Sequence, residues 1–216
     1  MKKLLLSILS VAVLFTASAD AALIITGVVD GPRTGGNPKA IEFYATADIA
    51  DLSIYNVETP NNGAASTGSE FALSGSASAG DFLYLASEST HFTAYFGFAP
   101  DFTGVVASIN GDDNVILYEN GITIDQFGVN GQDGSGFPWE YTDGFAYRVD
   151  NTGPDALYTS ANWTFSGIDF LDSQGTSGVN GSDGKTVPFG TYTAVPEPAS
   201  FALMFASVGA MLIRRK

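Results

Sequence analysis

Cysteine is absent from the 216 residues, and histidine occurs only once, at position 91. Without cysteine the chain can form no disulfide, no thiolate zinc site and no cysteine nucleophile. A single histidine also removes most histidine-based metal and acid–base sites. The neighbours Phe92, Tyr95 and Phe96 indicate that His91 occupies an apolar packing site. Because a G-x-S-x-G elbow is missing as well, the sequence predicts a protein that is not an enzyme.

Positive charge is scarce between the two ends of the chain. Residues 20–195 hold four basic residues against 22 acidic ones, which gives a net charge of −18; the basic residues are Arg33, Lys39, Arg148 and Lys185. Such a surface repels phosphate backbones, so no nucleic acid is expected as a partner. Cations, and neutral glycans bridged by calcium, are compatible with this charge.

Glycine and aromatic residues are abundant. The chain contains 25 glycines, 16 phenylalanines and nine tyrosines, while 15% of its residues are charged. This composition is typical of an all-β domain with many turns, and its apolar content argues against disorder. At this length a folded domain buries roughly 70% of its unfolded surface, so a core can form without cross-links.

The N-terminus has the layout of a secretory signal peptide, which we expect to span residues 1–19. Two lysines precede an apolar stretch over 4–15, and the small-residue site Ala17-Ser18-Ala19 follows. This is the order of n-region, h-region and A-x-A cleavage site. Cleavage after Ala19 or Ala21 would export the mature chain. An uncleaved N-terminal anchor is the alternative.

The C-terminus combines a proline-rich motif, a short apolar run and a basic end. As a helix, the apolar or small residues 199–213 would span about 22 Å, less than the hydrocarbon core of roughly 30 Å. The terminal Arg214-Arg215-Lys216 supplies a cytoplasmic stop under the positive-inside rule. Pro196 and Pro198 keep the preceding segment extended. The sequence therefore predicts a short transmembrane helix that anchors the chain only temporarily.

The layout VPEPAS–apolar–RRK closely resembles the PEP-CTERM sorting signal of Gram-negative bacteria. The resemblance covers residues 195–216 and rests on Val195, Pro196, Glu197, Pro198, Arg214, Arg215 and Lys216. It implies that an exosortase-type membrane enzyme recognises the motif and removes the helix. The protein would then pass from the inner membrane to the cell surface or extracellular matrix, in bacteria that commonly make exopolysaccharide. An ordinary C-terminal anchor behind a proline-rich spacer is the alternative.

Short strand-like segments fill the middle of the chain. They are rich in β-branched and aromatic residues and are separated by turn-forming residues, and such a series favours a sandwich or barrel. Asn120-Gly121 suits a type I′ turn between two strands, and residues 89–97 predict a helical turn or short helix. The expected strands cover 22–29, 39–45, 51–57, 69–73, 81–87, 114–119, 122–128 and 145–149.

Taken in order, these segments resemble the lamin-tail domain, an immunoglobulin-like β-sandwich of nuclear lamins and many secreted bacterial proteins. The resemblance is strongest over residues 22–150. It rests on the opening strand LIITGVVDG, the strand KAIEFYA with the acidic Glu42, two hairpins, and FAYR with Arg148. Ala45 departs from the family pattern, which usually has Asn there. The resemblance implies an all-β, immunoglobulin-like sandwich over 22–192, whose last part packs on the sheets or adds edge strands.

Oxygen ligands are plentiful just before the second hairpin. Asn110, Asp112 and Asn114 stand at alternating positions, but the Gly and Glu that an EF-hand loop requires are missing. One interpretation is a calcium site outside that motif, at Asp112 and Asp113. The other is a turn whose side chains cap backbone N–H groups. No further cofactor is indicated.

An aromatic cluster lies in the segment FPWEYTDGFAYR. In an extended chain Phe137, Trp139 and Tyr141 would share one face. Exposed rings would form a stacking platform for sugars, with Glu140 or Asp143 binding hydroxyl groups. Buried rings would instead form one wall of the core, which we expect because a sandwich needs bulky inward residues.

The sequence leads to two main hypotheses of function. The first is a surface scaffold or adhesin that binds extracellular polysaccharide or other surface proteins through sheet edges and acidic loops. The second is a carbohydrate-binding module that uses the aromatic residues of 137–147. A secreted hydrolase acting through paired carboxylates is a third reading. Exposure of Trp139 and Tyr141 separates the first two, because stacking needs accessible rings.

Overall fold

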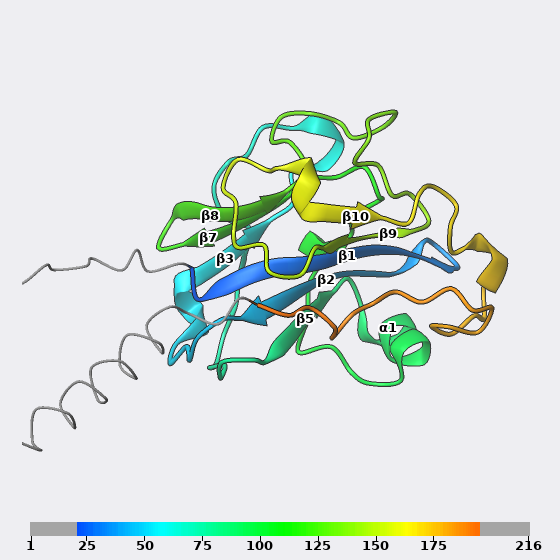
Figure 1. The fold of residues 1–216 in the computed structure, drawn as a ribbon, viewed down its shortest axis with the longest axis horizontal. Coiled ribbons are helices and arrows are strands. Elements are labelled where there is room, and N and C mark those ends of the chain that lie inside the picture. The colour runs from blue at the N-terminus through cyan, green and yellow to red at the C-terminus, as the bar shows by residue number, and fades with distance from the viewer. Residues whose placement is uncertain (1–20, 195–216) are drawn as a thin grey trace, which may run out of the picture. The chain divides into compact units, whose positions relative to one another are not determined.

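Two β-sheets dominate the structure, a computed structural model that describes residues 21–194 (Figure 1). These residues belong to one unit, Asp20–Val195. Within the described part, ten strands form the sheets, and the only α-helix, α1, spans Ser89–Phe96. The predicted all-β fold is therefore confirmed. The expected signal peptide, sorting motif and transmembrane helix lie outside the described residues.

The larger sheet has six strands in the order β10-β9-β1-β2-β5-β6, and the smaller has four in the order β4-β3-β7-β8. All neighbours are antiparallel except β5 and β6, which are parallel. The larger sheet consists of β1 (Leu23–Arg33), β2 (Asn37–Ala45), β5 (Phe82–Ala86), β6 (Phe102–Thr103), β9 (Phe145–Arg148) and β10 (Trp163–Phe165). The smaller consists of β3 (Tyr55–Glu58), β4 (Phe71–Ala72), β7 (Val115–Glu119) and β8 (Ile122–Phe127).

The main hydrophobic core lies between the two sheets. Ile41 and Phe43 of β2 enter it from the larger sheet, and Leu117 and Phe127 enter it from β7 and β8 of the smaller sheet. All four side chains are fully buried or nearly so. Because two sheets face each other across one core, the architecture is a β-sandwich.

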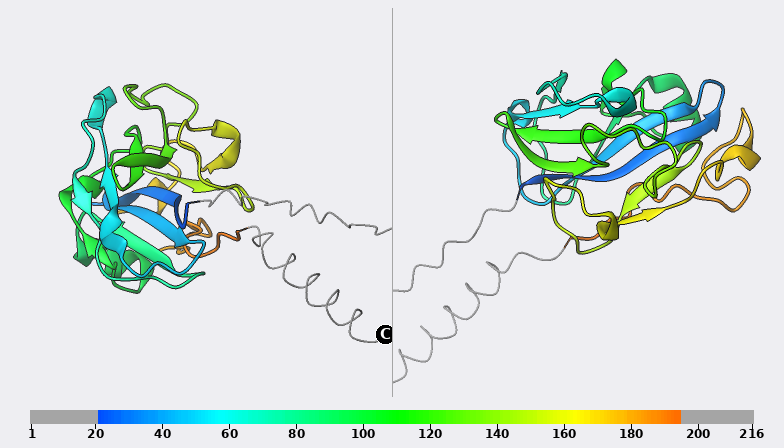
Figure 2. Two further views of the ribbon diagram at one scale, coloured as in Figure 1. Left: turned by 90° about the vertical axis from the view of Figure 1, so that its left-hand side faces the viewer. Right: turned by 90° about the horizontal axis from the view of Figure 1, so that it is seen from above.

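A third layer covers the outer face of the larger sheet. It consists of α1 and of residues 187–194, which we call the C-terminal strap; its Val187, Phe189 and Tyr192 pack on the sheet. Figure 2 shows this orange segment on the side of β1 that faces away from β7 and β8. A strand buried on both faces reads as a continuous apolar run rather than an alternating one, which explains the sequence LIITGVV in β1.

Glycine allows the strap to approach β1 closely. A Cβ atom built at Gly27 would lie 2.6 Å from the Phe189 ring and 2.9 Å from the Tyr147 ring. No side chain larger than hydrogen fits there without a shift of these rings. The glycine in the middle of β1 therefore belongs to the contact between strand and strap.

The predicted hairpin turn and helix are both confirmed. Asn120 and Gly121 have φ values of 51° and 79°, as a type I′ turn between β7 and β8 requires. The helix α1 begins after Glu88, whose side chain accepts hydrogen bonds from two backbone N–H groups, and ends at Gly97 with φ 84°. Among residues 21–194 the structure contains no helix with the length and hydrophobicity that a membrane span requires.

Several strand boundaries differ from the expected ones. The segment 51–57 is only half strand, because the Asp51 side chain accepts the Ser53 N–H and starts the 3-10 helix η1 (Leu52–Ile54) before β3. The sequence pattern missed the two-residue strand β6 and did not place β10. Both are short edge strands, and β10 confirms that the segment after residue 150 adds an edge.

Candidate functional site

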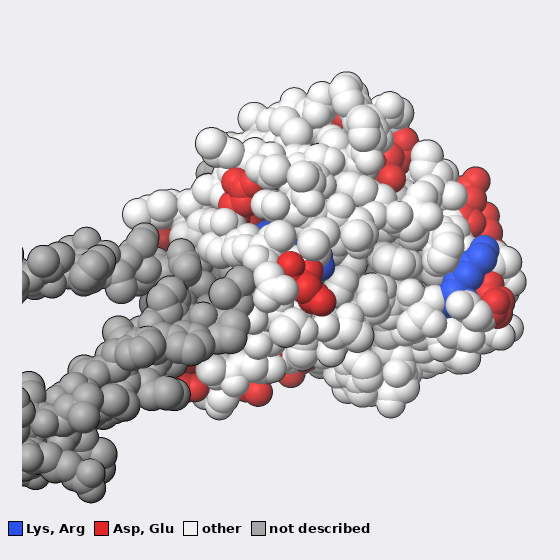
Figure 3. All heavy atoms as spheres, in the orientation of Figure 1, with Lys and Arg blue, Asp and Glu red and all other residues white. Residues whose placement is uncertain are grey.

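The described surface is strongly acidic. Figure 3 shows carboxylate groups on several parts of one face and little exposed basic surface. Two basic side chains are used in ion pairs: Lys39 with Asp30, and Arg148 with Asp125. Arg33 donates to the Gly178 carbonyl and Lys185 to the Phe170 carbonyl. Most of the negative charge is therefore not neutralised within the domain, and it is available to cations or basic partners.

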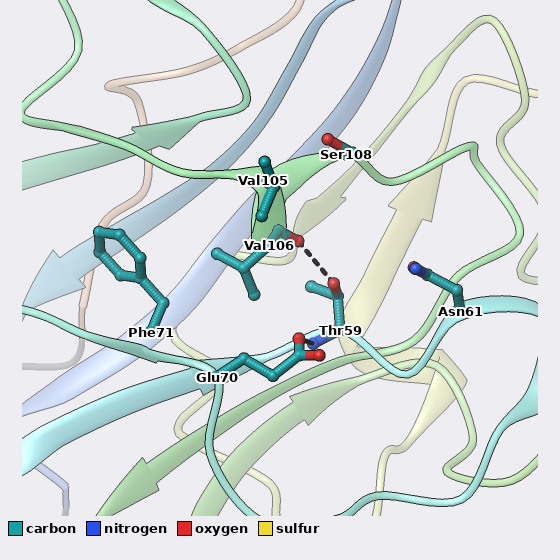
Figure 4. Close-up of a pocket in the computed structure, with 7 residues that line it drawn as sticks. All are labelled: Thr59, Asn61, Glu70, Phe71, Val105, Val106 and Ser108. Carbon is teal, nitrogen blue, oxygen red and sulfur yellow. Dashed lines mark hydrogen bonds between the residues drawn. The ribbon is translucent and has the colours of Figure 1, made fainter.

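An open pocket of about 340 Å³ lies at the side of the sandwich where both sheets end in two-residue strands (Figure 4). It lies between the chain after β3 and the 3-10 helix η3 (Val105–Ala107), which follows β6. Its lining combines apolar and polar side chains: Thr59, Asn61, Glu70, Phe71, Val105, Val106 and Ser108.

Phe71 closes the side of the sandwich next to this pocket. Its ring lies edge-to-face with Phe102 of β6, with centroids 6.4 Å apart. A Cβ atom at Gly104 would lie 2.7 Å from the Phe71 ring, so glycine is needed for the ring to reach β6. The two edge strands β4 and β6 therefore meet through one aromatic pair.

Hydrogen bonds hold the polar wall of the pocket. Thr59 donates its hydroxyl to the Val106 carbonyl at 2.5 Å and its N–H to the Glu70 carboxylate at 3.1 Å. Val105 is 89% exposed beside them. The arrangement offers an apolar wall and a few polar groups, which suits a small polar ligand. The one carboxylate of the lining, Glu70, is already used by the Thr59 N–H.

Glu58 fixes the loop that leads from β3 to β4 along this pocket. Its buried carboxylate accepts hydrogen bonds from Ser66 Oγ at 2.5 Å, the Thr67 N–H at 2.6 Å and Tyr118 Oη at 2.6 Å. Burial alone would raise the pKa of Glu58, but these hydrogen bonds outweigh it and lower the pKa to about 2. No sequence pattern marked this residue.

An exposed sugar-stacking platform, the alternative to burial, is not found at Phe137, Trp139 and Tyr141. Trp139 is 4% exposed and Tyr141 is fully buried, whereas Phe137 is 45% exposed. The three rings do not share a face, because residues 134–141 form turns in place of an extended strand. The rings of Trp139 and Tyr141 pack around Phe127, with centroid distances of 5.9 and 5.4 Å, so the expectation of burial is correct for these two.

The acidic residues before β7 divide into two roles. Asp113 is buried, and its two oxygens accept the N–H groups of Asn62 at 2.8 Å and Asn110 at 3.0 Å. It therefore caps backbone groups, as one of the two interpretations predicted. Asp112 accepts the Ser135 hydroxyl with one oxygen at 2.8 Å, and its other oxygen has no hydrogen-bond partner among the described residues. Calcium binding at Asp112 and Asp113 stays a prediction.

Three carboxylates that no sequence pattern brings together lie close to one another in the structure. One oxygen each of Asp143, Asp169 and Asp172 lies within 4.8 Å of the others. Burial, and then the neighbouring charges of Asp172 and Asp169, raise the pKa of Asp143. Such a group could hold a divalent cation, but exposed acidic groups often gather without one. Only the fold could reveal it, since its members come from two separate segments.

Arg148 and His91 both take part in polar contacts inside the domain. Arg148 forms an ion pair with Asp125 at 2.6 Å. The expected apolar site of His91 is wrong in part: the ring is half-buried, and its Nδ1 accepts a hydrogen bond from Arg33 Nε at 3.2 Å. The buried residues of α1 are Phe92 and Tyr95, and His91, one turn before Tyr95, lies at the edge of that buried face.

Comparison of the chain with protein-family models, with curated proteins and with solved structures gives no match.

Proposed function

We propose that the protein is an exported, exosortase-sorted protein of the cell surface or extracellular matrix, whose β-sandwich acts by binding or by structure and not by catalysis. The observation that carries this proposal is the end of the chain, where Val195-Pro196-Glu197-Pro198 precedes an apolar run and Arg214-Arg215-Lys216. The N-terminal signal peptide would bring the chain to the inner membrane. The short apolar run would hold it there until the processing enzyme removes it.

The ends of the described domain support tethering from one side. Ile24 at the start of β1 lies in the same outer cluster as Tyr192 and Ala194 of the strap. Tyr44, the strand partner of Ile24, lies 5.2 Å from Tyr192 between ring centroids. In Figure 1 the chain enters β1 and leaves the strap at the same end of the sandwich.

For the fold type we propose an immunoglobulin-like sandwich of the lamin-tail kind. Its support is the order of elements in two facing sheets, with Glu42 in β2 and Arg148 at the end of β9. For the binding role we propose extracellular polysaccharide or other surface proteins as partners, within an exopolysaccharide matrix or biofilm. The acidic surface and the open pocket support this choice, since both are accessible to such partners.

The sorting proposal is tested by expressing the full chain in a Gram-negative host with and without an exosortase. We expect mass spectrometry to show a product that has lost the apolar run only when the enzyme is present. A combined Pro196→Ala and Glu197→Ala variant should keep the tail, whereas the control Ser182→Ala, in an exposed loop, should be processed normally. An unprocessed wild-type chain in the complete host would refute the proposal.

A further inference from the structure

The open pocket beside the edge strands β4 and β6 has an apolar side and a polar side. In Figure 4, Phe71, Val105 and Val106 lie towards one side of the pocket. Asn61 and Ser108 lie towards the other. The volume of about 340 Å³ is at the lower end of the range for pockets that hold small molecules. The pocket therefore matches a small group that itself has an apolar face and a polar edge.

Contacts within the protein hold the polar side in place. The Asn62 N–H donates to the Asp113 carboxylate at 2.8 Å, which fixes the 3-10 helix η2 (Asn61–Gly63). The Thr59 hydroxyl donates to the Val106 carbonyl and so ties this part of the chain to η3. A site that is already ordered loses less conformational entropy when it binds a ligand.

Three polar side chains of the lining are available to a ligand. Glu70 uses one carboxylate oxygen, Oε2, to accept the Thr59 N–H at 3.1 Å. Its Oε1, the Asn61 side-chain amide and the Ser108 hydroxyl form no hydrogen bond with another residue of the range 21–194. All three side chains are exposed. They offer one acceptor, Glu70, and two groups, Asn61 and Ser108, that both donate and accept.

This set of groups selects a neutral, hydroxylated ligand. The lining contains no basic side chain and Glu70 repels anions, so carboxylate, phosphate and sulfate groups are disfavoured. An ammonium group only donates hydrogen bonds, so it would leave the N–H groups of the Asn61 amide without an acceptor. Its attraction to an exposed carboxylate such as Glu70 is weak as well. Hydroxyl groups both donate and accept, and they therefore match all three side chains.

A sugar ring combines such hydroxyl groups with an apolar C–H face. On the apolar side, the Phe71 ring is fixed by its edge-to-face contact with Phe102 at 6.4 Å and by its close approach to Gly104. A fixed aromatic ring gives a large apolar contact at little cost in side-chain entropy. Resting on the proposed function, we infer that this pocket binds one sugar residue of a neutral polysaccharide. The sugar packs on Phe71, and its hydroxyl groups bond to Glu70 and Asn61.

Amide chemical-shift mapping by NMR tests this site on the full chain, in a detergent without a sugar headgroup. The probes are the methyl glycosides of glucose, galactose and mannose. At least one should cause saturable shifts confined to residues 59–61, 70–71 and 105–108, with a Kd of about 1 mM for a ligand of this size. No saturable shift with any probe at about 50 mM, where such a site would be almost filled, would overturn the inference. So would saturable shifts at other residues only.

Variants assign the binding to individual side chains. Asn61→Ala should weaken it about fivefold, the loss for one hydrogen-bonding group, and Phe71→Leu by a similar factor through loss of the ring. Ser108→Ala should lose about threefold, whereas Ser182→Ala, the matched control in an exposed loop, should bind like the wild type. Unchanged affinity in Asn61→Ala or in Phe71→Leu would overturn the inference. Because Asn61 is exposed, its variant keeps the test valid even if Phe71→Leu disturbs the edge strands.

Two charged probes test the class of ligand. The methyl glycoside of glucuronic acid and butylammonium chloride should both bind at least about tenfold more weakly than the best neutral glycoside. Equal or tighter binding of either probe would overturn the choice of a neutral sugar. Neither test depends on the sorting motif: glycoside binding without removal of the tail would refute the proposed sorting alone, and removal of the tail without glycoside binding would refute this inference alone.

Discussion

Replacement of Asp125 by Asn is expected to cost the fold about 3–5 kcal/mol, the range for a buried ion pair that loses one partner. Asp125 lies on β8 of the smaller sheet and Arg148 on β9 of the larger one. The guanidinium donates to both carboxylate oxygens, at 2.6 and 2.7 Å, and both side chains are fully buried. The pair therefore joins the two layers of the sandwich.

The magnitude follows from what each partner does besides pairing. Arg148 also donates to the carbonyls of Ile25 and Gly153 at 2.5 and 2.6 Å, and lies 4.6 Å from the centre of the Trp163 ring. Asp125 also accepts the N–H groups of Ile25 and Asp155, both at 2.8 Å. An Asn side chain keeps the shape but leaves the guanidinium buried without a counter-charge. Water cannot replace the carboxylate there.

Urea unfolding of the full chain measures this loss. With an m value of about 2 kcal/mol/M, the midpoint should fall by about 1.5–2.5 M. Asp172→Asn removes an exposed carboxylate beside two other acids and is the matched control; its stability should stay within about 0.5 kcal/mol of the wild type. If Asp125→Asn lost less than about 1 kcal/mol while its m value stayed the same, the pair would not link the sheets as the geometry indicates.

Three further predictions concern other parts of the domain. The pKa of Glu58 is about 2 in the folded protein, against an ordinary value of 4.5. Its contribution to folding stability is therefore present above pH 4.5 and is lost as the pH falls through 2. Glu58→Gln should lower stability at pH 7 by about 2–3 kcal/mol and flatten the acid dependence of unfolding curves. Trp139 and Trp163 are both nearly buried, so fluorescence should be weakly quenched by acrylamide and unchanged by exopolysaccharide, and strong quenching would contradict their burial. Gly27→Ala should push Phe189 outwards and cost about 1–3 kcal/mol, with increased exchange of the strap amides; unchanged exchange would refute the tight contact.

Local patterns predicted the elements of this fold well. The Asn120-Gly121 turn, the helix over 89–97 and most strands could be recognised because turn chemistry and side-chain periodicity act over a few residues. The boundaries were less certain where a side chain competes with the strand, as Asp51 does at η1. The two-residue strand β6 carries no pattern of its own, since the parallel neighbour β5 alone creates it.

The aromatic segment shows where local patterns stop. Alternation of Phe137, Trp139 and Tyr141 is meaningful only if the chain is extended, and turns place Phe137 outside and the other two inside. The turns follow from distant contacts: the Tyr141 N–H donates to the Gly111 carbonyl, and the Gly134 N–H donates to the Asp112 carbonyl. Neither contact can be predicted from the order of residues within the segment.

Composition and residue order are enough to predict an all-β fold, an acidic surface and the layout of both ends, since none of these depends on contacts between distant residues. The tertiary structure decided which carboxylates are buried and what holds them. Glu42 meets Gly190 across 148 positions of the chain, and Asp125 meets Arg148 from the opposite sheet. Burial and pairing of a charge depend on all the groups that surround it, and only the packing of both sheets and the strap brings those groups together.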